Sequence, residues 1–276
     1  MVTQTADRRL LWHPRLDDKF LVGSSSQITL YEWDVKTSEI KHVTSKHWQE
    51  PSVCIAWSPD PAFDDLVAVG FGLGKVDLLR LHDAKLPRGS AFSNGAALSG
   101  GPSITLPVRY SRPCNALAFC PADPNYLAVG LDKVRSDASL VIWDVITATA
   151  TLSIKSPTQL TFNVPPSGAP PRPQPLIPKG DIASRTDPRV LQQLVQGDMV
   201  SSVAFLPKST TLLLAGVSHR WLRLFDLRNP SPTVFTAASK VHGIATDPFD
   251  QHRIACYGDG IVTMLPRMAS TSKPTT

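Results

Sequence analysis

The sequence predicts an all-β protein, and three observations along its 276 residues support this. Short apolar runs recur throughout the chain, and Pro, Gly, Asp or Asn separates them, which is typical of strands and turns. The runs come in groups of three. The first run of a group ends at a Pro and the second ends at a Gly. Because short strands repeat with a fixed internal pattern, we predict a β-propeller with one four-stranded blade for each group.

Five groups fit the pattern, and their spacing is regular. The interval from the Pro to the Gly is 9, 11, 9, 9 and 10 residues in the five groups. We expect the apolar runs to pack blade against blade, the glycines to turn hairpins, and the fourth strand of each blade to lie in the linker that follows. The five blades are expected near residues 10–35, 53–81, 114–145, 200–228 and 241–265.

The third group shows the repeat most completely. The run Ala116–Phe119 ends at Cys120 and Pro121, and the run Tyr126–Val129 ends at Gly130. The third run, Leu140–Trp143, is followed by Asp144. A unit of three strands that closes on Trp-Asp has the signature of a WD repeat. We assign a structural role in the blades to the aromatic–Asp pairs of the first, third and fourth groups: Trp33, Asp34, Trp143, Asp144, Phe225 and Asp226.

Two insertions account for the length that five blades do not need. Residues 86–112 and 150–198 are rich in Pro, Gly and Ser, and we expect low-complexity loops there, the first of them mobile. Within the second insertion, Arg189–Gln196 has helical spacing and predicts one or two helical turns. Between the first two blades, Glu39–Val43 could supply an outer strand.

The pattern ends after Leu265, where a proline replaces the expected Trp-Asp and residues 266–276 are predicted to be a disordered tail. Either five blades close a ring, or the five blades are part of a larger one. We expect the larger ring, so that the WD-repeat domain of residues 1–265 is an incomplete propeller with an apolar blade face exposed.

Composition argues against several classes of protein. No apolar run approaches the ~20 residues of a membrane span, and the polar start of the chain is unlike a signal peptide, so a cytoplasmic location is expected. The net charge of +5 is spread along the chain without a basic cluster, which argues against nucleic acid as a partner. None of the cysteines forms a CxxC pair, so buried thiols are expected for Cys54, Cys114, Cys120 and Cys256.

No motif for catalysis or for a metal is present, and we predict that the protein is not an enzyme and has no cofactor. Four residues could act in catalysis by their type alone, but nothing in the sequence fixes their geometry: His13, His242, Asp247 and Asp259. The glycine-rich Gly70–Gly74 precedes another strand, so a hairpin is favoured over a phosphate-binding loop.

A charged loop in the third group is the candidate contact with a partner protein. It carries Lys133, Arg135 and Asp137 between two predicted strands. Loops on a rigid scaffold often carry recognition, although a solvated hairpin loop would have the same composition.

The third, fourth and fifth groups together resemble one family, the Mio (missing oocyte) WD-repeat proteins. The similar segments are Cys114–Ala118, Leu127–Lys133 with Arg135 and Asp137, Ile142–Asp144, Leu213–Gly216, Phe225–Asn229 and Val241–Pro248. The segment Leu131–Asp137 is the most specific of them, because generic WD repeats do not require it.

The resemblance implies a non-catalytic scaffold subunit of the SEA/GATOR complex, which regulates TOR kinase signalling in response to amino acids. It implies other subunits of that complex as partners, a location at the cytosolic face of the vacuole or lysosome membrane, and membrane contact only through partners. Family members continue with a helical solenoid and a zinc-binding module. Two alternatives remain open: a generic WD adaptor of a ubiquitin-ligase or RNA-related assembly, and, more remotely, a propeller enzyme.

Overall fold

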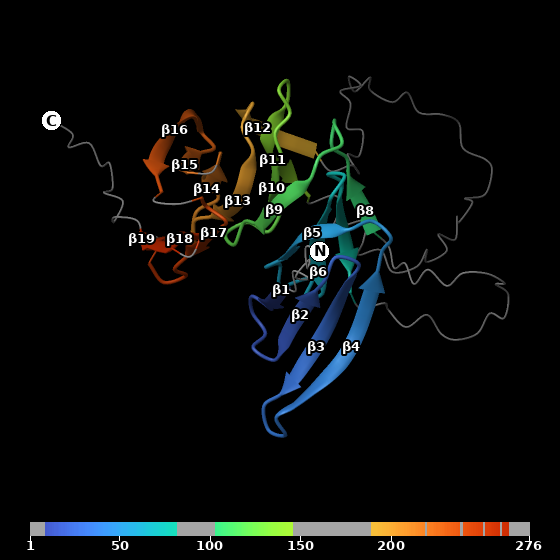
Figure 1. Cartoon of the computed structure of the whole chain (residues 1–276). Helices are drawn as coiled ribbons and strands as arrows, with labels where there is room; N and C mark the ends of the chain where they lie inside the picture. Colours follow the sequence, from blue (N-terminus) through green and yellow to red (C-terminus); the bar gives the residue numbers. More distant parts are fainter. Residues whose placement is uncertain are drawn as a thin grey trace, which may run out of the picture.

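The computed structural model describes residues 9–81, 103–145 and 189–264, apart from residues 219, 238, 239, 251 and 260. Throughout this part of the chain the regular structure is β-strand, arranged in five antiparallel sheets. Figure 1 shows the sheets around a common centre, with the first strand of each sheet inside. This is a five-bladed β-propeller arrangement, as predicted. Residues 1–8, the predicted tail and most of both insertions lie outside the described residues.

Blades 1 and 2 each have four strands in sequential order. Blade 1 comprises β1 (Arg9–Trp12), β2 (Lys19–Gly23), β3 (Gln27–Asp34) and β4 (Glu39–His47), and blade 2 comprises β5 (Ser52–Trp57), β6 (Leu66–Phe71), β7 (Val76–Arg80) and β8 (Ser103–Leu106). The outer strand proposed at Glu39–Val43 is confirmed as part of β4.

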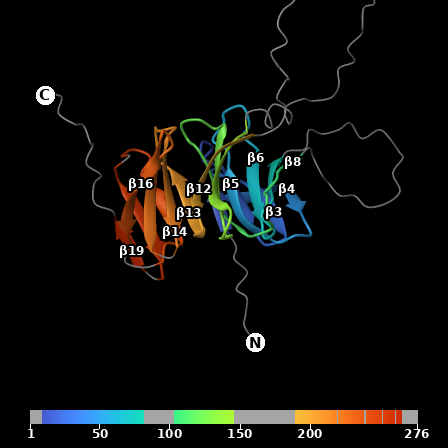
Figure 2. The ribbon, with the colours of Figure 1, turned by 90° about the horizontal axis from the view of Figure 1, so that it is seen from above.

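Blades 3 and 4 repeat this order, and three strands of blade 5 are described. Blade 3 comprises β9 (Cys114–Phe119), β10 (Tyr126–Leu131), β11 (Ala138–Asp144) and β12 (Arg189–Gln196). Blade 4 comprises β13 (Val200–Phe205), β14 (Leu212–Val217), β15 (Trp221–Asp226) and β16 (Asn229–Thr236). Blade 5 comprises β17 (Gly243–Thr246), β18 (Ile254–Gly258) and β19 (Ile261–Met264). In Figure 2 the blades follow one another across the molecule, from blue through green to red.

Two predictions about the insertions were wrong. Residues 103–106, expected in a mobile loop, form β8, because their backbone pairs with the outer edge of β7 and Leu106 is buried. Residues 189–196, expected to be helical, form β12, which pairs with β11. The edges of β7 and β11 offer unpaired backbone groups, and pairing with them overrides local spacing and composition.

The repeat glycines also differ from expectation, because they lie within strands and do not turn hairpins. Gly130 pairs with Ala116 on one side and with Leu140 on the other. A Cβ built on Gly130 would lie 2.8 Å from Val200 Cγ1 of the next blade. The glycine therefore leaves room for the first strand of the following blade. The hairpin prediction holds for the turn before β7, where Gly74 has a φ of 95°.

The core lies between successive blades. One buried cluster joins blades 1 and 2 through Leu21, Leu30 and Val69. Further clusters join blade 2 to blade 3, blade 3 to blade 4 and blade 4 to blade 5. Each sheet therefore buries apolar side chains on the faces that meet a neighbour, as the period of two along each strand requires.

In blades 1 and 4 the repeat aspartate stabilises the turn between the third and fourth strands. Asp34 accepts the backbone N–H of Lys36 at 3.0 Å, and Asp226 accepts that of Arg228 at 3.0 Å. The backbone hydrogen bond from Lys36, together with the Lys41 side chain, holds the pKa of Asp34 below its ordinary value. The Arg228 side chain is the main cause that lowers the pKa of Asp226, and the backbone hydrogen bond adds to it. Asp144 pairs with Arg189 of β12 at 3.1 Å.

Candidate protein-interaction site

The face of blade 1 that points away from blade 2 is aromatic. Cross-strand pairing places Trp12 opposite Phe20 and Phe20 opposite Tyr31 on this face. The rings are in contact, with centroids 5.1 Å apart for the first pair and 5.4 Å for the second, which is stacked. Trp33 lies two residues beyond Tyr31 and meets Trp12 edge-on at 6.2 Å. With Leu10, these residues form what we call the blade 1 end face.

Trp33 shows that this face lacks the cover its counterparts have. Trp143 and Phe225 stand at the same place in their repeats, directly before the Asp, and each packs against the preceding blade. Their exposed fractions are 6% and 4%, whereas that of Trp33 is 36%. Trp12 is 49% exposed. No described blade precedes blade 1, so its aromatic side chains face outward.

The other end of the blade series also presents an apolar face. In blade 5, Ile244 and Ile254 pack against blade 4. Residues of the opposite face are Tyr257, Val262 and Met264, which we call the blade 5 end face, and each of them is more than half exposed. Among the described residues no buried cluster joins blade 5 to blade 1. The expected exposure of an apolar blade face is confirmed at both ends.

The charged loop of blade 3 connects β10 to β11 and divides into two parts. Lys133 and Arg135 are exposed and point into solvent. Asp137 instead accepts a hydrogen bond from Arg112 Nη2 at 2.8 Å, and its side chain is largely buried. Contact of this loop with a partner stays a prediction, and the exposed lysine and arginine are the residues available for it.

Arg112 anchors the loop and was missed by sequence reasoning, which placed it in a mobile insertion. Its guanidinium is buried and also donates to the carbonyl oxygens of Ala138 at 2.7 Å and of Asp132 at 3.3 Å. Burial lowers the pKa of Arg112, and the carboxylates of Asp137 and Asp132 oppose that shift. An arginine in a Pro- and Ser-rich stretch gives no sequence signal of burial.

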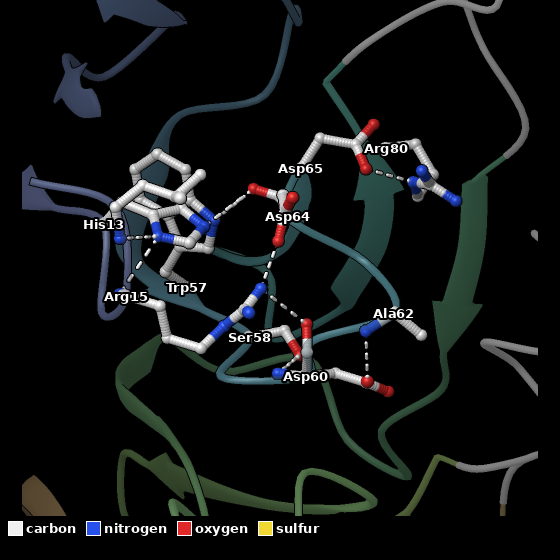
Figure 3. A network of polar contacts seen from close by, with 10 residues as sticks. His13, Arg15, Trp57, Ser58, Asp60, Ala62, Asp64, Asp65 and Arg80 are labelled. Atoms are coloured by element: carbon white, nitrogen blue, oxygen red, sulfur yellow. Dashed lines mark hydrogen bonds and ion pairs between the residues drawn. The ribbon is translucent and has the colours of Figure 1, made fainter. Parts of the chain in front are cut away.

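His13 joins blade 1 to blade 2 at the edge of their interface (Figure 3). Its Nε2 lies 2.9 Å from the carbonyl oxygen of Asp64, while its Nδ1 accepts the backbone N–H groups of Arg15 and Leu16 at 3.1 and 2.9 Å. These partners require the neutral tautomer with the proton on Nε2. Burial is the main cause that lowers the pKa of His13. Figure 3 also shows Arg15 reaching the Asp64 carboxylate and Trp57 beside the imidazole.

The other residues considered for catalysis lie in blade 5, and only two of them meet. His242 Nε2 lies 3.0 Å from Asp259 Oδ1, and both side chains are exposed. That hydrogen bond holds the pKa of Asp259 below its ordinary value. Asp247 accepts backbone N–H groups in its own turn and pairs with Arg253 at 3.2 Å. Within the described ranges, no group of three or more potential ligands could hold a metal ion.

The repeat, the Trp-Asp closures and the blade geometry define a WD40-type propeller with apolar end faces. A family model described as MIOS, WD40 repeat, matches residues 36–160 and 182–274, which together are most of the chain. The chain belongs to this family, in agreement with the sequence resemblance. The described residues include no helix with the length and hydrophobicity that crossing a bilayer requires.

Several relatives carry the same family name. The chain is 30% identical over 274 residues to the GATOR2 complex protein MIOS-A of Xenopus laevis, covering 92% of this chain and 28% of the relative. It is 29% identical over 269 residues to the GATOR2 complex protein MIOS of Danio rerio, with the same coverage. For the Dictyostelium discoideum protein of that name the identity is 30%, covering 73% of this chain and 18% of the relative. The chain thus spans less than a third of the length of these relatives.

Solved structures support the fold alone. A chain in a structure of the outer-coat vertex of COPII on membranes is similar with a TM-score of 0.62 and 14% identity, covering 92% of this chain and 57% of that chain. A chain in a structure of the COPII coat assembled on membranes has the same TM-score and identity, and the similarity covers 92% of this chain and 31% of that chain.

Proposed function

We propose that the chain is a non-catalytic protein-interaction scaffold in a GATOR2-type complex, and that its two end faces bind protein. The observation that carries the proposal is the exposure of apolar side chains at both ends of the blade series, at Trp12, Trp33, Tyr257, Val262 and Met264. Its relatives are named as proteins of the GATOR2 complex, which supports subunits of such a complex as the partners.

The physical argument concerns the free energy of covering these faces. Burial of a large apolar side chain contributes about 1.5–3 kcal/mol. Five such side chains left in water are a liability for a free protein and a source of affinity for a partner that covers them. The aromatic rings of blade 1 suit an interface core, because aromatic residues are enriched there.

Membership of the family supports the finer parts of the proposal. On this account the complex regulates TOR kinase signalling in response to amino acids at the cytosolic face of the vacuole or lysosome membrane. The chain would contact the membrane only through its partners. Its contribution is a rigid surface, because each blade packs against the next through a buried cluster.

The proposal is tested by affinity capture of the tagged protein, expressed from its own locus. Mass spectrometry then identifies every protein that is recovered. A variant with Trp12→Glu and Met264→Glu places a charge on each end face. Leu73→Glu is the matched control, since Leu73 is 61% exposed in the turn between β6 and β7. We expect the wild type and the control to recover GATOR2-type subunits and the end-face variant to lose them.

Two other results would decide against the proposal. Capture of ubiquitin-ligase or RNA-related assemblies in place of GATOR2-type subunits would support a generic WD adaptor. Equal recovery of GATOR2-type subunits by all three proteins would mean that the end faces do not bind them.

A further inference from the structure

The interface between blades 2 and 3 contains two thiols side by side. Cys54 lies on β5 and Cys114 begins β9, so they occupy the first strands of neighbouring blades. Their Sγ atoms are 3.5 Å apart, and the Cys54 thiol donates to the carbonyl oxygen of Cys114 at 3.1 Å. Both cysteines are free. A disulfide bond is about 2.05 Å long, so the two sulfurs would need to approach by about 1.5 Å in total.

We propose that Cys54 and Cys114 are a redox modification site, where a peroxide links blade 2 to blade 3 through a disulfide. This inference is independent of the proposed function, because it rests on the interior of the propeller and not on its end faces.

Comparison of the blade junctions shows what is particular to this one. At each junction the repeat glycine faces a side chain of the next blade, which is aliphatic at three places: Ile55, Val200 and Val241. At the junction of blades 2 and 3 the side chain is Cys114. A Cβ built on Gly70 would lie 2.5 Å from Cys114 Sγ and 2.6 Å from Cys54 Sγ. The lack of a side chain at Gly70 is therefore what allows the two sulfurs to lie together.

The other two cysteines are in different surroundings. Cys120 donates its thiol to the carbonyl oxygen of Ser209 at 3.4 Å. Cys256 lies on β18 in the small cluster between blades 4 and 5. Proximity of thiols therefore selects Cys54 and Cys114 and provides Cys120 as an internal control.

The reaction balances with one peroxide for each disulfide. Cys54 is the less buried of the two cysteines, at 4% exposed against 0% for Cys114. Its thiolate sulfur attacks a peroxide oxygen and breaks the O–O bond, which gives a sulfenic acid and hydroxide. The sulfur of Cys114 then attacks Cys54 Sγ, the S–S bond forms and the S–O bond breaks. The second hydroxide leaves, and the two thiol protons convert both hydroxides to water. Two thiols are oxidised and hydrogen peroxide is reduced.

The closed interface makes this reaction slow. The hydrogen bond between Cys54 and Cys114, together with burial, raises the pKa of the Cys114 thiol well above its usual range, so this thiol stays protonated while the interface is closed. Oxidation therefore requires a local opening between the two blades. Once formed, the bond closes a loop between residues 60 positions apart and holds the blades together.

The test is peroxide treatment of the purified full chain in its folded state, followed by peptide mapping without reductant. We expect a linked peptide pair containing Cys54 and Cys114, and a melting temperature higher by roughly 5–15 °C that dithiothreitol reverses. Cys120→Ser should give the same linked pair. Cys114→Val, which places at this junction the residue type of Val200, should melt near the reduced wild type and show no linkage and no rise.

Three results would overturn the proposal. One is oxidation of Cys120 or Cys256 in the folded protein while Cys54 and Cys114 stay reduced. Another is a linked pair that forms only after denaturation. The third is a rise in melting temperature of equal size in Cys114→Val, since that rise could not come from this disulfide.

Discussion

Replacement of Asp137 by alanine should destabilise the propeller strongly, although Asp137 lies in a surface loop. The Arg112 guanidinium is buried with its side chain 3% exposed, and Asp137 Oδ2 accepts its hydrogen bond at 2.8 Å. Without the carboxylate, Arg112 keeps two carbonyl acceptors, while its Nε has no hydrogen-bond partner among the residues that the structure describes. The buried cation would then lack the only carboxylate that accepts its hydrogen bond among the described residues, which costs about 3 kcal/mol. For a protein of this size the melting temperature should fall by about 6–12 °C.

The same loop supplies the matched control. Lys133 and Arg135 are exposed, so Lys133→Glu with Arg135→Glu should change the free energy of unfolding by less than about 0.5 kcal/mol for each substitution. Thermal unfolding followed by circular dichroism measures both variants. The reasoning is refuted if Asp137→Ala melts within about 1 °C of the wild type, or if the double charge reversal lowers the melting temperature as much as Asp137→Ala does.

Two further predictions concern the blade junctions. Gly130→Ala should lower the free energy of unfolding by about 1–3 kcal/mol, because its Cβ would meet Val200 Cγ1 at 2.8 Å. Gly72→Ala should cost little, because among the described residues its Cβ would meet only Pro51 O, at 3.7 Å. Urea unfolding of both variants measures the difference. Stability should also fall as the pH drops below about 6.5, since burial lowers the folded-state pKa of His13 and the unfolded chain then binds more protons. Melting temperatures between pH 7.5 and 5 should fall less for His13→Gln, and an equal fall in both proteins would contradict the role given to His13.

The repeat pattern predicted the fold because it records interactions that every blade makes. Runs such as Tyr126–Val129 pack between neighbouring sheets, and the interval from Pro to Gly is set by the first turn and the second strand. The fourth strands were harder to predict, because β8 and β12 contribute mainly backbone pairing to an edge that already exists. Residues 189–196 have helical spacing and residues 103–106 lie in a stretch rich in Pro, Gly and Ser, so the local sequence predicted a helix and a loop.

The candidate site was predictable only in part, for a related reason. Lys133 and Arg135 could be found because charges between two apolar runs indicate an exposed loop. The inward position of Asp137 depends on Arg112, which is 25 residues earlier in the chain. The exposure of Trp33 could not be predicted from its repeat, since Trp143 in the matching position is buried. What distinguishes them is the presence of a neighbouring blade, which is a property of the whole assembly.

Hydrogen exchange measured by mass spectrometry tests most directly whether the end faces bind protein. Amide exchange would be compared between the free chain and the chain in its purified native complex. We predict slower exchange in the complex for β1–β3 of blade 1 and for β17–β19 of blade 5, with β5–β7 of blade 2 unchanged. Unchanged exchange in both end blades, together with protection confined to other surfaces, would contradict the account.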